Sequence, residues 1–426
     1  MSQTRSPRSR STEPPGEVLR EPGWRDRLNQ HPMAPYYLIL GAAMLLLVLG
    51  LVMVLSSSAV ESYEIHDSAF TLFIRQAIFA GLGVLAMVFI SRMPISLMRR
   101  LALIFLVASI GMLILTFVPG IGAGVNGQRN WIRLVGPFRL QPSEFAKLAL
   151  IVWSADLFAR REGHLHQWRS LLLPFLPVVA VVIGLVLLEG DLGTAIILAV
   201  IVGGLLFVVG APMRIFVAFG VLGLAGIAAM SLTAGYRIRR FTAWLDPSAD
   251  LDGAGWQLTQ GKVALGTGGW WGVGLGGSRE KWGALPEAHT DFIFPVIGEE
   301  LGLFGALTVL ALFAAMTIFA LRMAIRTSDA FVRVTCVGIV AWIVGQALIN
   351  LGAVLQLLPI TGVPLPFISY GGSSLLPSLM AVGVLLGFAR QEAARTVAAR
   401  AAAAGDSAGR DSDARLRLAA GRAVRR

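Results

Sequence analysis

Many ionisable side chains lie close together in the segment GLGGSREKWGALPEAHTDFIFPVIGEELG, residues 274–302. Its charged and titratable members are Arg279, Glu280, Lys281, Glu287, His289, Asp291, Glu299 and Glu300. Asp291 is the last polar residue before an apolar run, and a carboxylate in such a place can act as a general base. We take Asp291 as the candidate catalytic residue. The structural alternative is that Asp291 caps the following helix, whose Pro295 suits a first turn.

A second set of charged residues opens other apolar runs. Lys147 follows Glu144 by three residues in QPSEFAK, so the two side chains can form an ion pair on one helix face. Because charged pairs at membrane depth usually mark a site or a pathway, we favour a functional role for them. Arg75 lies about one turn inside another run and should point into the protein. For Asp191, which begins a further run, we favour the role of helix N-cap.

Two other segments bear on the candidate site. We interpret His289 as a packing or orienting group, since no histidine in the chain belongs to an HExxH-like metal pattern. The segment LPITGVPLPF, residues 358–367, contains three prolines and predicts a rigid loop or a broken helix. It leads to ISYGGSS with Ser369 and Tyr370, where small residues allow close packing or a cavity.

The composition predicts a membrane protein. Of the 426 residues 55% are hydrophobic and 14% charged, with a mean hydropathy of +0.71, which lies outside the range of soluble globular domains. The single cysteine, Cys336, lies in an apolar run, so neither a disulfide framework nor a thiolate metal site is expected. The formal net charge of +11 is concentrated in the two ends, which indicates basic tails near an anionic leaflet rather than a nucleic-acid groove.

Apolar runs long enough to span a hydrocarbon core of roughly 30 Å recur along the chain, the fourth and the last being short. They predict an all-α polytopic membrane protein with about ten transmembrane helices. The runs are 36–55, 69–90, 101–118, 145–158, 171–188, 192–209, 215–232, 292–320, 334–355 and 375–388. Residues 1–35 and 391–426 lack apolar periodicity and are expected to be disordered tails, the second rich in Arg and Ala.

Arginine placement predicts the orientation of these spans. The loops after the second, fourth, sixth and eighth spans all carry arginine, and a ten-span count puts the four loops on one side. The positive-inside rule makes that side cytoplasmic, together with both termini. The segment 236–292, between the seventh and eighth spans, is then a large extracytoplasmic loop. No signal-peptide pattern precedes the first span, which is expected to remain as an anchor.

The outward side nevertheless carries many cations. Arg129, Arg133 and Arg139 precede the fourth span, and Arg239 and Lys281 lie in the segment 236–292. Cations on the side that the rule disfavours suggest an anionic ligand there. The alternative is that long translocated loops escape the rule.

Several motifs resemble the SEDS family of FtsW, RodA and SpoVE. They are NGQRNWIRL, QPSEFAK, GDLGTA, PEAHTDFIFPVIGEELG and LPITGVPLPFISYGGSS, in this order over residues 36–390. Within the family, GGSREKW followed by LPEAHTDFIF is more similar to the cell-division branch, FtsW, than to the elongation branch, RodA. The chain departs from the family pattern at Glu189, Pro295 and Gln356.

The resemblance implies a peptidoglycan glycosyltransferase that polymerises lipid II, an undecaprenyl-pyrophosphate-linked disaccharide peptide, during septal wall synthesis. Residues 36–390 would form the catalytic domain in the bacterial plasma membrane, at the division septum. The implied partners are a class B penicillin-binding protein that carries the transpeptidase, other divisome proteins and membrane lipid, with no role for nucleic acid. The family's catalytic Asp falls on Asp291.

The chemistry requires a base for the acceptor hydroxyl and positive charge for the departing diphosphate. Either cations or a divalent metal ion, Mg²⁺ or Mn²⁺, could supply that charge, and the sequence leaves this choice open. The candidate substrate-binding residues are Arg75, Arg129, Arg133, Glu144, Lys147, Arg239, Lys281, His289, Ser369 and Tyr370. Two alternatives stay open: a transporter that flips lipid II across the bilayer, and a polymerase for elongation like RodA.

Overall fold

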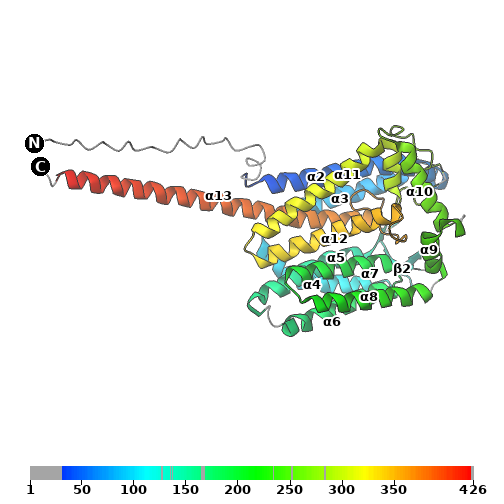
Figure 1. Cartoon of the computed structure of the whole chain (residues 1–426), viewed down its shortest axis with the longest axis horizontal. Coiled ribbons are helices and arrows are strands. Elements are labelled where there is room, and N and C mark those ends of the chain that lie inside the picture. The colour runs from blue at the N-terminus through cyan, green and yellow to red at the C-terminus, as the bar shows by residue number, and fades with distance from the viewer. Residues whose placement is uncertain are drawn as a thin grey trace, which may run out of the picture.

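The structure, a computed structural model, is a bundle of long helices that lie side by side (Figure 1). It describes residues 31–423 except 126, 127, 135, 137, 165–167, 234, 251, 252, 283 and 284. Each of the ten predicted apolar runs falls largely within one long helix. These helices are α2 (Ala34–His66), α3 (Thr71–Ser91), α4 (Ile95–Leu115), α5 (Pro142–Arg160), α6 (Trp168–Leu188), α7 (Leu192–Val208), α8 (Met213–Thr233), α11 (Ile293–Arg326), α12 (Ala330–Val354) and α13 (Gly372–Ala423).

Length and composition suit these helices to a bilayer. Six helices in the described part of the chain are long and apolar enough to cross a membrane: α2, α3, α4, α11, α12 and α13. Shorter apolar stretches of 10–17 residues lie in α6, α7 and α8. Large apolar side chains such as Leu85, Phe89 and Ile104 are 64–69% exposed, as expected where a helix faces lipid. The predicted polytopic membrane fold is therefore confirmed.

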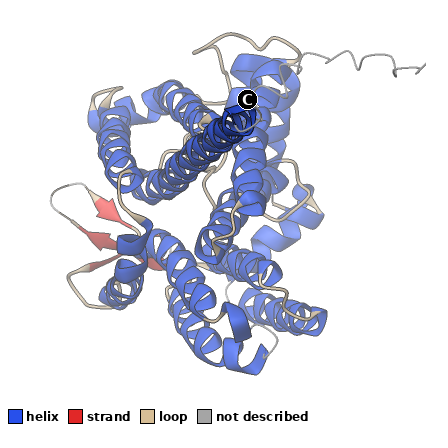
Figure 2. Cartoon of the chain, turned by 90° about the vertical axis from the view of Figure 1, so that its left-hand side faces the viewer, coloured by secondary structure: helices blue, strands red, loops and turns tan. Residues whose placement is uncertain are grey.

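The end of the bundle opposite the arginine-bearing loops contains structure that the sequence analysis did not predict. A three-stranded antiparallel sheet, β1 (Gly122–Val125), β2 (Gln128–Arg133) and β3 (Arg139–Leu140), joins α4 to α5. It lies at one edge of the bundle (Figure 2). The description all-α is thus incomplete, because strands of two to six residues are too short for their period to stand out in a sequence.

The segment 236–292, expected as a large loop, also contains two helices. They are α9 (Gly235–Leu245) and α10 (Ala254–Gly268), which lie at the same end as the sheet (Figure 1). α10 packs closely against α11: a Cβ atom at Gly268 would stand 1.9 Å from the carbonyl oxygen of Gly298. Glycine is therefore required at this contact, because any side chain would collide with the backbone of α11.

Helix α11 has a sharp kink at Gly302, where φ is 68° and ψ is −166°. A Cβ atom at Gly302 would stand 2.4 Å from the backbone nitrogen of Gly272, so the loop before the helix folds back onto the kink. Glu299 and Glu300, both fully buried, hold this loop. Glu299 accepts hydrogen bonds from the Ser278 hydroxyl and the Arg279 amide, and Glu300 accepts from Lys281 and Ser56.

The C-terminal residues differ from the sequence-based expectation of disorder from residue 391. Helix α13 continues to Ala423 and projects beyond the bundle at the arginine-bearing end (Figure 1). Alanine and arginine are among the strongest helix formers, which accounts for the continuation of the helix beyond the apolar run 375–388. The N-terminal segment 1–30, also expected as a tail, lies outside the described residues.

Candidate functional site

Asp291 lies where the long polar segment meets α11. The helix begins at Ile293, and its N-cap is Phe292, which makes no side-chain capping bond, so Asp291 does not serve as the cap. The Asn350 side chain on α12 holds the backbone here: its Nδ2 donates to the carbonyl oxygens of Asp291 and Val363, both at 2.8 Å. The Asp291 carboxylate is left to face a cavity.

This cavity has a volume of about 500 Å³ and a polar wall. Four carboxylates line it, namely Asp291, Glu287, Asp191 and Glu144, together with Arg240 from α9. Gly362 lies beside the carboxylate, since a Cβ atom there would stand in ordinary contact, 3.8 Å from Asp291 Oδ2 and 3.5 Å from Arg240 Nη1, and its φ of 73° favours glycine. The remaining lining residues are Gln128, Asn130, Trp131, Gln141, Thr194, Gln257, Thr290, Thr361, Val363, Pro364, Tyr370, Gly371, Ser373 and Ser374.

The cavity favours a basic carboxylate at Asp291. Burial raises the pKa of Asp291 above its usual value of 3.8, and the negative charge of Glu287 raises the pKa further. Thr290 and Arg240 oppose this rise, since each stabilises the ionised carboxylate. A carboxylate with a raised pKa holds an abstracted proton more readily near neutral pH.

A second cavity of about 670 Å³ adjoins the first and has the opposite charge. Its arginines are Arg75 from α3, Arg133 from β2 and Arg139 from β3, and no carboxylate is among the described residues of its wall. Both cavities share the wall residues Trp131, Thr290, Tyr370, Gly371 and Ser373. The structure therefore places a carboxylate-lined space beside an arginine-lined space.

Tyr370 stands at the boundary between the two cavities. Burial raises the pKa of Tyr370, while the nearby positive charge of Arg75 acts in the opposite direction. The hydroxyl is thus protonated at neutral pH, beside Arg75, in a residue that lines both cavities.

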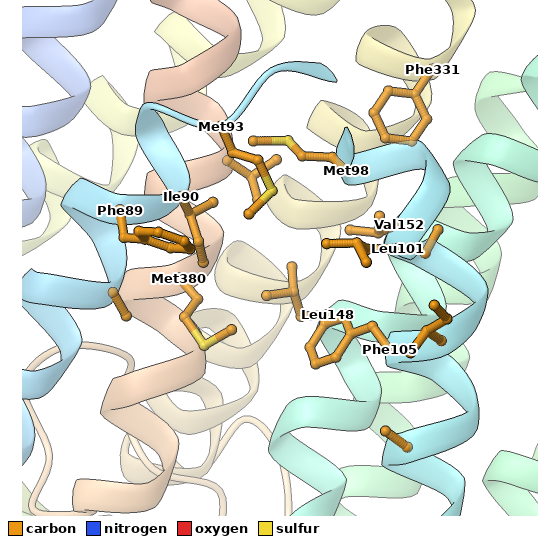
Figure 3. A pocket seen from close by; sticks show the side chains of 15 residues that line it. Phe89, Ile90, Met93, Met98, Leu101, Phe105, Leu148, Val152, Phe331 and Met380 are labelled. Carbon is orange, nitrogen blue, oxygen red and sulfur yellow. The ribbon is translucent and has the colours of Figure 1, made fainter. Parts of the chain in front are cut away.

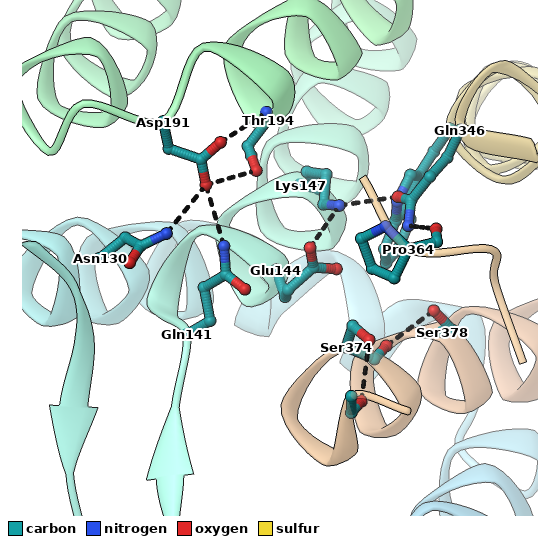
Figure 4. Close-up of polar contacts among 12 residues, drawn as sticks. Asn130, Gln141, Glu144, Lys147, Asp191, Thr194, Gln346, Pro364, Ser374 and Ser378 are labelled. Atoms are coloured by element: carbon teal, nitrogen blue, oxygen red, sulfur yellow. Dashed lines mark hydrogen bonds and ion pairs between the residues drawn. The ribbon is translucent and has the colours of Figure 1, made fainter. Parts of the chain in front are cut away.

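Asp191 fills the structural role expected of it and also lines the first cavity. Its Oδ1 accepts from the Thr194 amide at 2.9 Å, so it is the N-cap of α7. Its Oδ2 accepts from Gln141 at 2.9 Å, from Asn130 at 3.3 Å and from the Thr194 hydroxyl at 2.8 Å (Figure 4). These bonds tie the start of α7 to β2 and to the start of α5.

Glu144 and Lys147 form a buried ion pair with a distance of 2.8 Å, and their side chains are only 2% and 1% exposed. Lys147 Nζ also donates to Gln346 Oε1 at 2.9 Å, and Gln346 Nε2 donates to the Pro364 carbonyl at 2.9 Å (Figure 4). This chain of bonds links α5 through α12 to the proline-rich loop. Lys147 is therefore a structural cation, whereas Glu144 lines the cavity and its Oε2 has no partner among the described residues.

Of the other predicted site residues, some line a cavity and the others lie in the structure around the two cavities. Arg75, Arg133, Glu144 and Tyr370 line a cavity, and their role as substrate ligands stays a prediction. Lys281 does not line a cavity, because it lies 3.0 Å from Glu300 and is 5% exposed. Arg129 is exposed on β2 and lines neither cavity, and its amide donates to the Glu189 carbonyl. Arg239 is on α9, but its side chain lies outside the described residues.

His289 and Ser369 make contacts in the segments that surround the two cavities. His289 Nδ1 lies 3.1 Å from Glu61 Oε2, and the packing or orienting role of His289 stays a prediction. Its carbonyl oxygen accepts from the Tyr370 amide at 2.8 Å. The Ser369 hydroxyl accepts from the Leu365 amide at 2.8 Å, so Ser369 stabilises the proline-rich loop instead of lining a cavity.

The sequence analysis missed several residues that the fold brings to the site. Arg240 is a cation whose positive charge lowers the pKa of Asp291, and Arg139 is the third arginine of the arginine-lined cavity. Asn350 and Gln346 were not selected, although amides inside an apolar helix are a signal of buried polar bonds. Choosing Arg240 over its neighbours needs the helix α9, which the sequence did not predict.

Comparisons with known proteins agree with this architecture. Residues 36–394 match the family of FtsW, RodA and SpoVE, described as "Cell cycle protein". The chain is 42% identical over 361 residues to the probable peptidoglycan glycosyltransferase FtsW of Mycobacterium tuberculosis, covering 85% of this chain and 69% of the relative. It is 41% identical over 357 residues to the stage V sporulation protein E of Bacillus subtilis, covering 84% and 97%.

Solved structures show the same fold. A chain from a study entitled "Structural coordination of polymerization and crosslinking by a peptidoglycan synthase complex" superposes with a TM-score of 0.66 at 29% identity, covering 83% of this chain and 97% of that one. The rod shape determining protein RodA of Thermus thermophilus superposes with a TM-score of 0.60 at 26% identity, covering 84% and 97%. With the match spanning all ten helices and both cavities, the chain belongs to the SEDS family of FtsW, RodA and SpoVE.

Proposed function

We propose that this protein is a peptidoglycan glycosyltransferase that polymerises lipid II into glycan strands, with Asp291 as the general base. The observation that carries the proposal is the position of the Asp291 carboxylate, on the wall of a polar cavity that adjoins a cavity lined by three arginines. Support also comes from the family and from relatives that are named as peptidoglycan glycosyltransferases.

In this mechanism the Asp291 carboxylate takes the proton of the acceptor sugar hydroxyl. The oxygen then attacks the anomeric carbon of the donor sugar, and the bond from that carbon to the diphosphate breaks. Diphosphate is a good leaving group and needs no proton from a second carboxyl group, unlike the alkoxide released by a glycosidase. One base with a raised pKa, together with positive charge for the diphosphate, is therefore sufficient.

Arg75, Arg133 and Arg139 would neutralise the diphosphate, since guanidinium groups bind phosphate oxygens through paired hydrogen bonds. Glu144, whose Oε2 has no partner among the described residues, would accept a hydrogen bond from a sugar hydroxyl. Among the described residues no three His, Cys, Asp or Glu side chains gather closely enough to hold a metal ion. We assign the neutralisation to these arginines because of their place in the adjoining cavity, and treat Mg²⁺ or Mn²⁺ as a variable of the assay.

The polyprenyl chain of the substrate would follow α3 and α13 into lipid. These two helices line the arginine cavity through Phe79 and Ser373, and farther along they line an apolar groove of about 480 Å³ through Ile90 and Met380. Figure 3 shows this groove, whose opposite wall is made by Leu101 and Phe105 of α4. Apolar walls with exposed members suit an isoprenoid chain.

We also propose that the protein works in septal wall synthesis beside a class B penicillin-binding protein. The structural neighbour comes from a study of a complex that coordinates polymerisation and crosslinking, and FtsW relatives are similar over more than four fifths of this chain. The bacterial plasma membrane at the division site, with other division proteins nearby, is the corresponding location.

The test is polymerisation of purified lipid II by the reconstituted protein with its transpeptidase partner, with and without Mg²⁺ or Mn²⁺. Asp291→Asn should lower the rate by about a hundredfold or more, since general bases contribute factors of this size. Asp246→Asn is the matched control, because Asp246 lies on the same face in an exposed turn beside Ser248. An Asp291→Asn protein with the control's activity would refute the base. Wild-type protein that moves lipid II across vesicles without making polymer would favour the transporter.

A further inference from the structure

A third cavity lies at the opposite end of the bundle from Asp291. Its volume is about 270 Å³, and it is formed where the start of α2, the end of α11 and the middle of α13 meet. Among the described residues of its wall are three arginines, Arg322 and Arg326 of α11 and Arg400 of α13, and one carboxylate, Glu392. Neither the catalytic proposal nor the family resemblance uses this cavity.

The charges of this cavity favour an anion of the phosphate class. Arg322 and Arg326 are one helical turn apart, so their guanidinium groups project from the same face of α11. Each guanidinium carries five N–H donors in a fork that matches phosphate oxygens. The N-terminus of α2 is also part of the wall, through Ala34 and Pro35, and its first turn contains no acidic residue. The positive end of that helix adds to the attraction for an anion.

The floor of the cavity is apolar, which distinguishes a lipid from a free ion. Met323 and Ala389 are 4% and 2% exposed, and Phe319 lies beneath the Arg322 guanidinium at 5.3 Å from the ring centroid. Charged groups thus form the rim, and apolar side chains continue from it toward the interior of the bundle. An amphipathic ligand with a phosphate beside an acyl chain would satisfy both parts.

The position of the cavity agrees with a lipid of one leaflet. It lies at the end of the bundle that carries the arginine-bearing loops, which the positive-inside rule makes cytoplasmic. Basic pockets between transmembrane helices on that side are suited to anionic headgroups, which enrich the cytoplasmic leaflet. We propose that this cavity binds the phosphate headgroup of an anionic phospholipid from the cytoplasmic leaflet, between Arg322, Arg326 and Arg400.

The proposal is tested by lipid retention on the purified full-length protein, measured by native mass spectrometry from mixed phosphatidylglycerol and phosphatidylcholine micelles. Wild type should retain phosphatidylglycerol in preference to phosphatidylcholine by about tenfold, which corresponds to a difference of about 1.4 kcal/mol in binding free energy. The double variant Arg322→Gln/Arg326→Gln should lose this preference. The matched control is Arg160→Gln/Arg333→Gln, which removes the same charge from the same face outside the cavity.

Two further measurements keep the outcome decisive. Glu392→Gln removes the carboxylate from the rim and should increase phosphatidylglycerol retention, a change that loss of folding cannot produce. Thermal unfolding is also compared in inorganic phosphate and in phosphatidylglycerol. A simple anion site would be stabilised equally by the two, whereas a lipid site would be stabilised more by phosphatidylglycerol. Equal retention by wild type and the Arg322→Gln/Arg326→Gln variant, or equal loss in the control, would overturn the proposal. None of these readouts depends on polymerisation, so the result stands apart from the proposed catalytic function.

Discussion

At the scale of single residues, the effect of Glu287 on the pKa of Asp291 can be tested through the pH dependence of the reaction. Glu287 raises the pKa of Asp291 through its negative charge, whereas Asp291 must be ionised to accept a proton. Glu287→Gln should therefore lower the pKa of Asp291 and move the acidic limb of the kcat/KM profile for lipid II polymerisation to lower pH. Asp246→Asn serves as the control and should leave the limb in place. A limb that moves to higher pH would contradict the charge relation between Glu287 and Asp291.

Mutation of the ion pair between Glu144 and Lys147 tests whether Lys147 stabilises the fold or binds the substrate. Lys147→Met leaves the Glu144 carboxylate buried without its partner, and breaking such a pair costs about 3 to 5 kcal/mol. We expect a marked fall in the thermal midpoint of Lys147→Met, and a partial recovery in Glu144→Gln/Lys147→Met, where no unpaired charge remains. Thermal unfolding in detergent measures both. A Lys147→Met protein of normal stability that binds lipid II poorly would instead make Lys147 a ligand of the diphosphate.

Glu189 predicts a dependence of stability on pH. It lies between α6 and α7, accepts a hydrogen bond from Thr116, and burial raises its pKa from 4.5 to about 8. Between these two values the unfolded chain releases the proton while the folded protein keeps it, so Glu189 lowers the free energy of unfolding as pH rises. Glu189→Gln should therefore raise the thermal midpoint near pH 8 and have little effect near pH 4. Glu64→Gln, at an exposed position, is the control. An equal effect of Glu189→Gln at both pH values would contradict the raised pKa.

At the scale of elements, α12 connects the catalytic segment to the proline-rich loop. Asn350 joins the carbonyl oxygens of Asp291 and Val363, and Gln346, one turn earlier, joins Lys147 to Pro364. Both amides are buried. The helix therefore fixes the backbone of Asp291 relative to the loop that carries Gly362, which lies beside the carboxylate.

Asn350 is accordingly expected to act as a positioning residue. Asn350→Ala should lower kcat for polymerisation by about ten- to a hundredfold with little change in KM, because a misplaced base slows the chemical step more than it weakens binding. Steady-state kinetics with lipid II measure this division. The control is Ser378→Ala, a buried hydroxyl that bonds only within its own helix. A fall in stability with kcat unchanged in the folded fraction would reduce Asn350 to a purely structural role.

The elements also show where sequence reasoning succeeds and where it stops. Hydrophobic runs predicted all ten long helices, because burial and lipid contact leave a strong one-dimensional signal. α9 and the sheet lack that signal, since they are short and their stability comes from tertiary contacts. The motifs selected Asp291, Arg133 and Tyr370, and a cation inside an apolar run selected Arg75; the fold places all four on the cavity walls. Lys281 is instead paired with Glu300, because the segment 278–281 folds back onto the start of α11, a contact that sequence spacing does not show.

At the scale of the whole molecule, polar chemistry is divided between the two ends of the helices. The carboxylate and arginine cavities lie at the end that carries α9, α10 and the sheet, and the third cavity lies at the end from which α13 projects (Figure 1). A transporter concentrates its substrate site near the middle of the membrane. The separation found here suits an enzyme that acts on a lipid-linked sugar at one surface.

The orientation of the two ends can be measured with two single substitutions. Ser248, between α9 and α10, and Ser328, between α11 and α12, are both exposed and lie at opposite ends of the bundle. Because the ten-span order places α10 and Asp291 on the extracytoplasmic side, Ser248→Cys should react with a membrane-impermeant maleimide in intact spheroplasts. Ser328→Cys should react only after permeabilisation. Wild type is the control, since its single cysteine, Cys336, is buried in α12. The reverse labelling pattern would place Asp291 in the cytoplasm and exclude strand synthesis outside the membrane at this site.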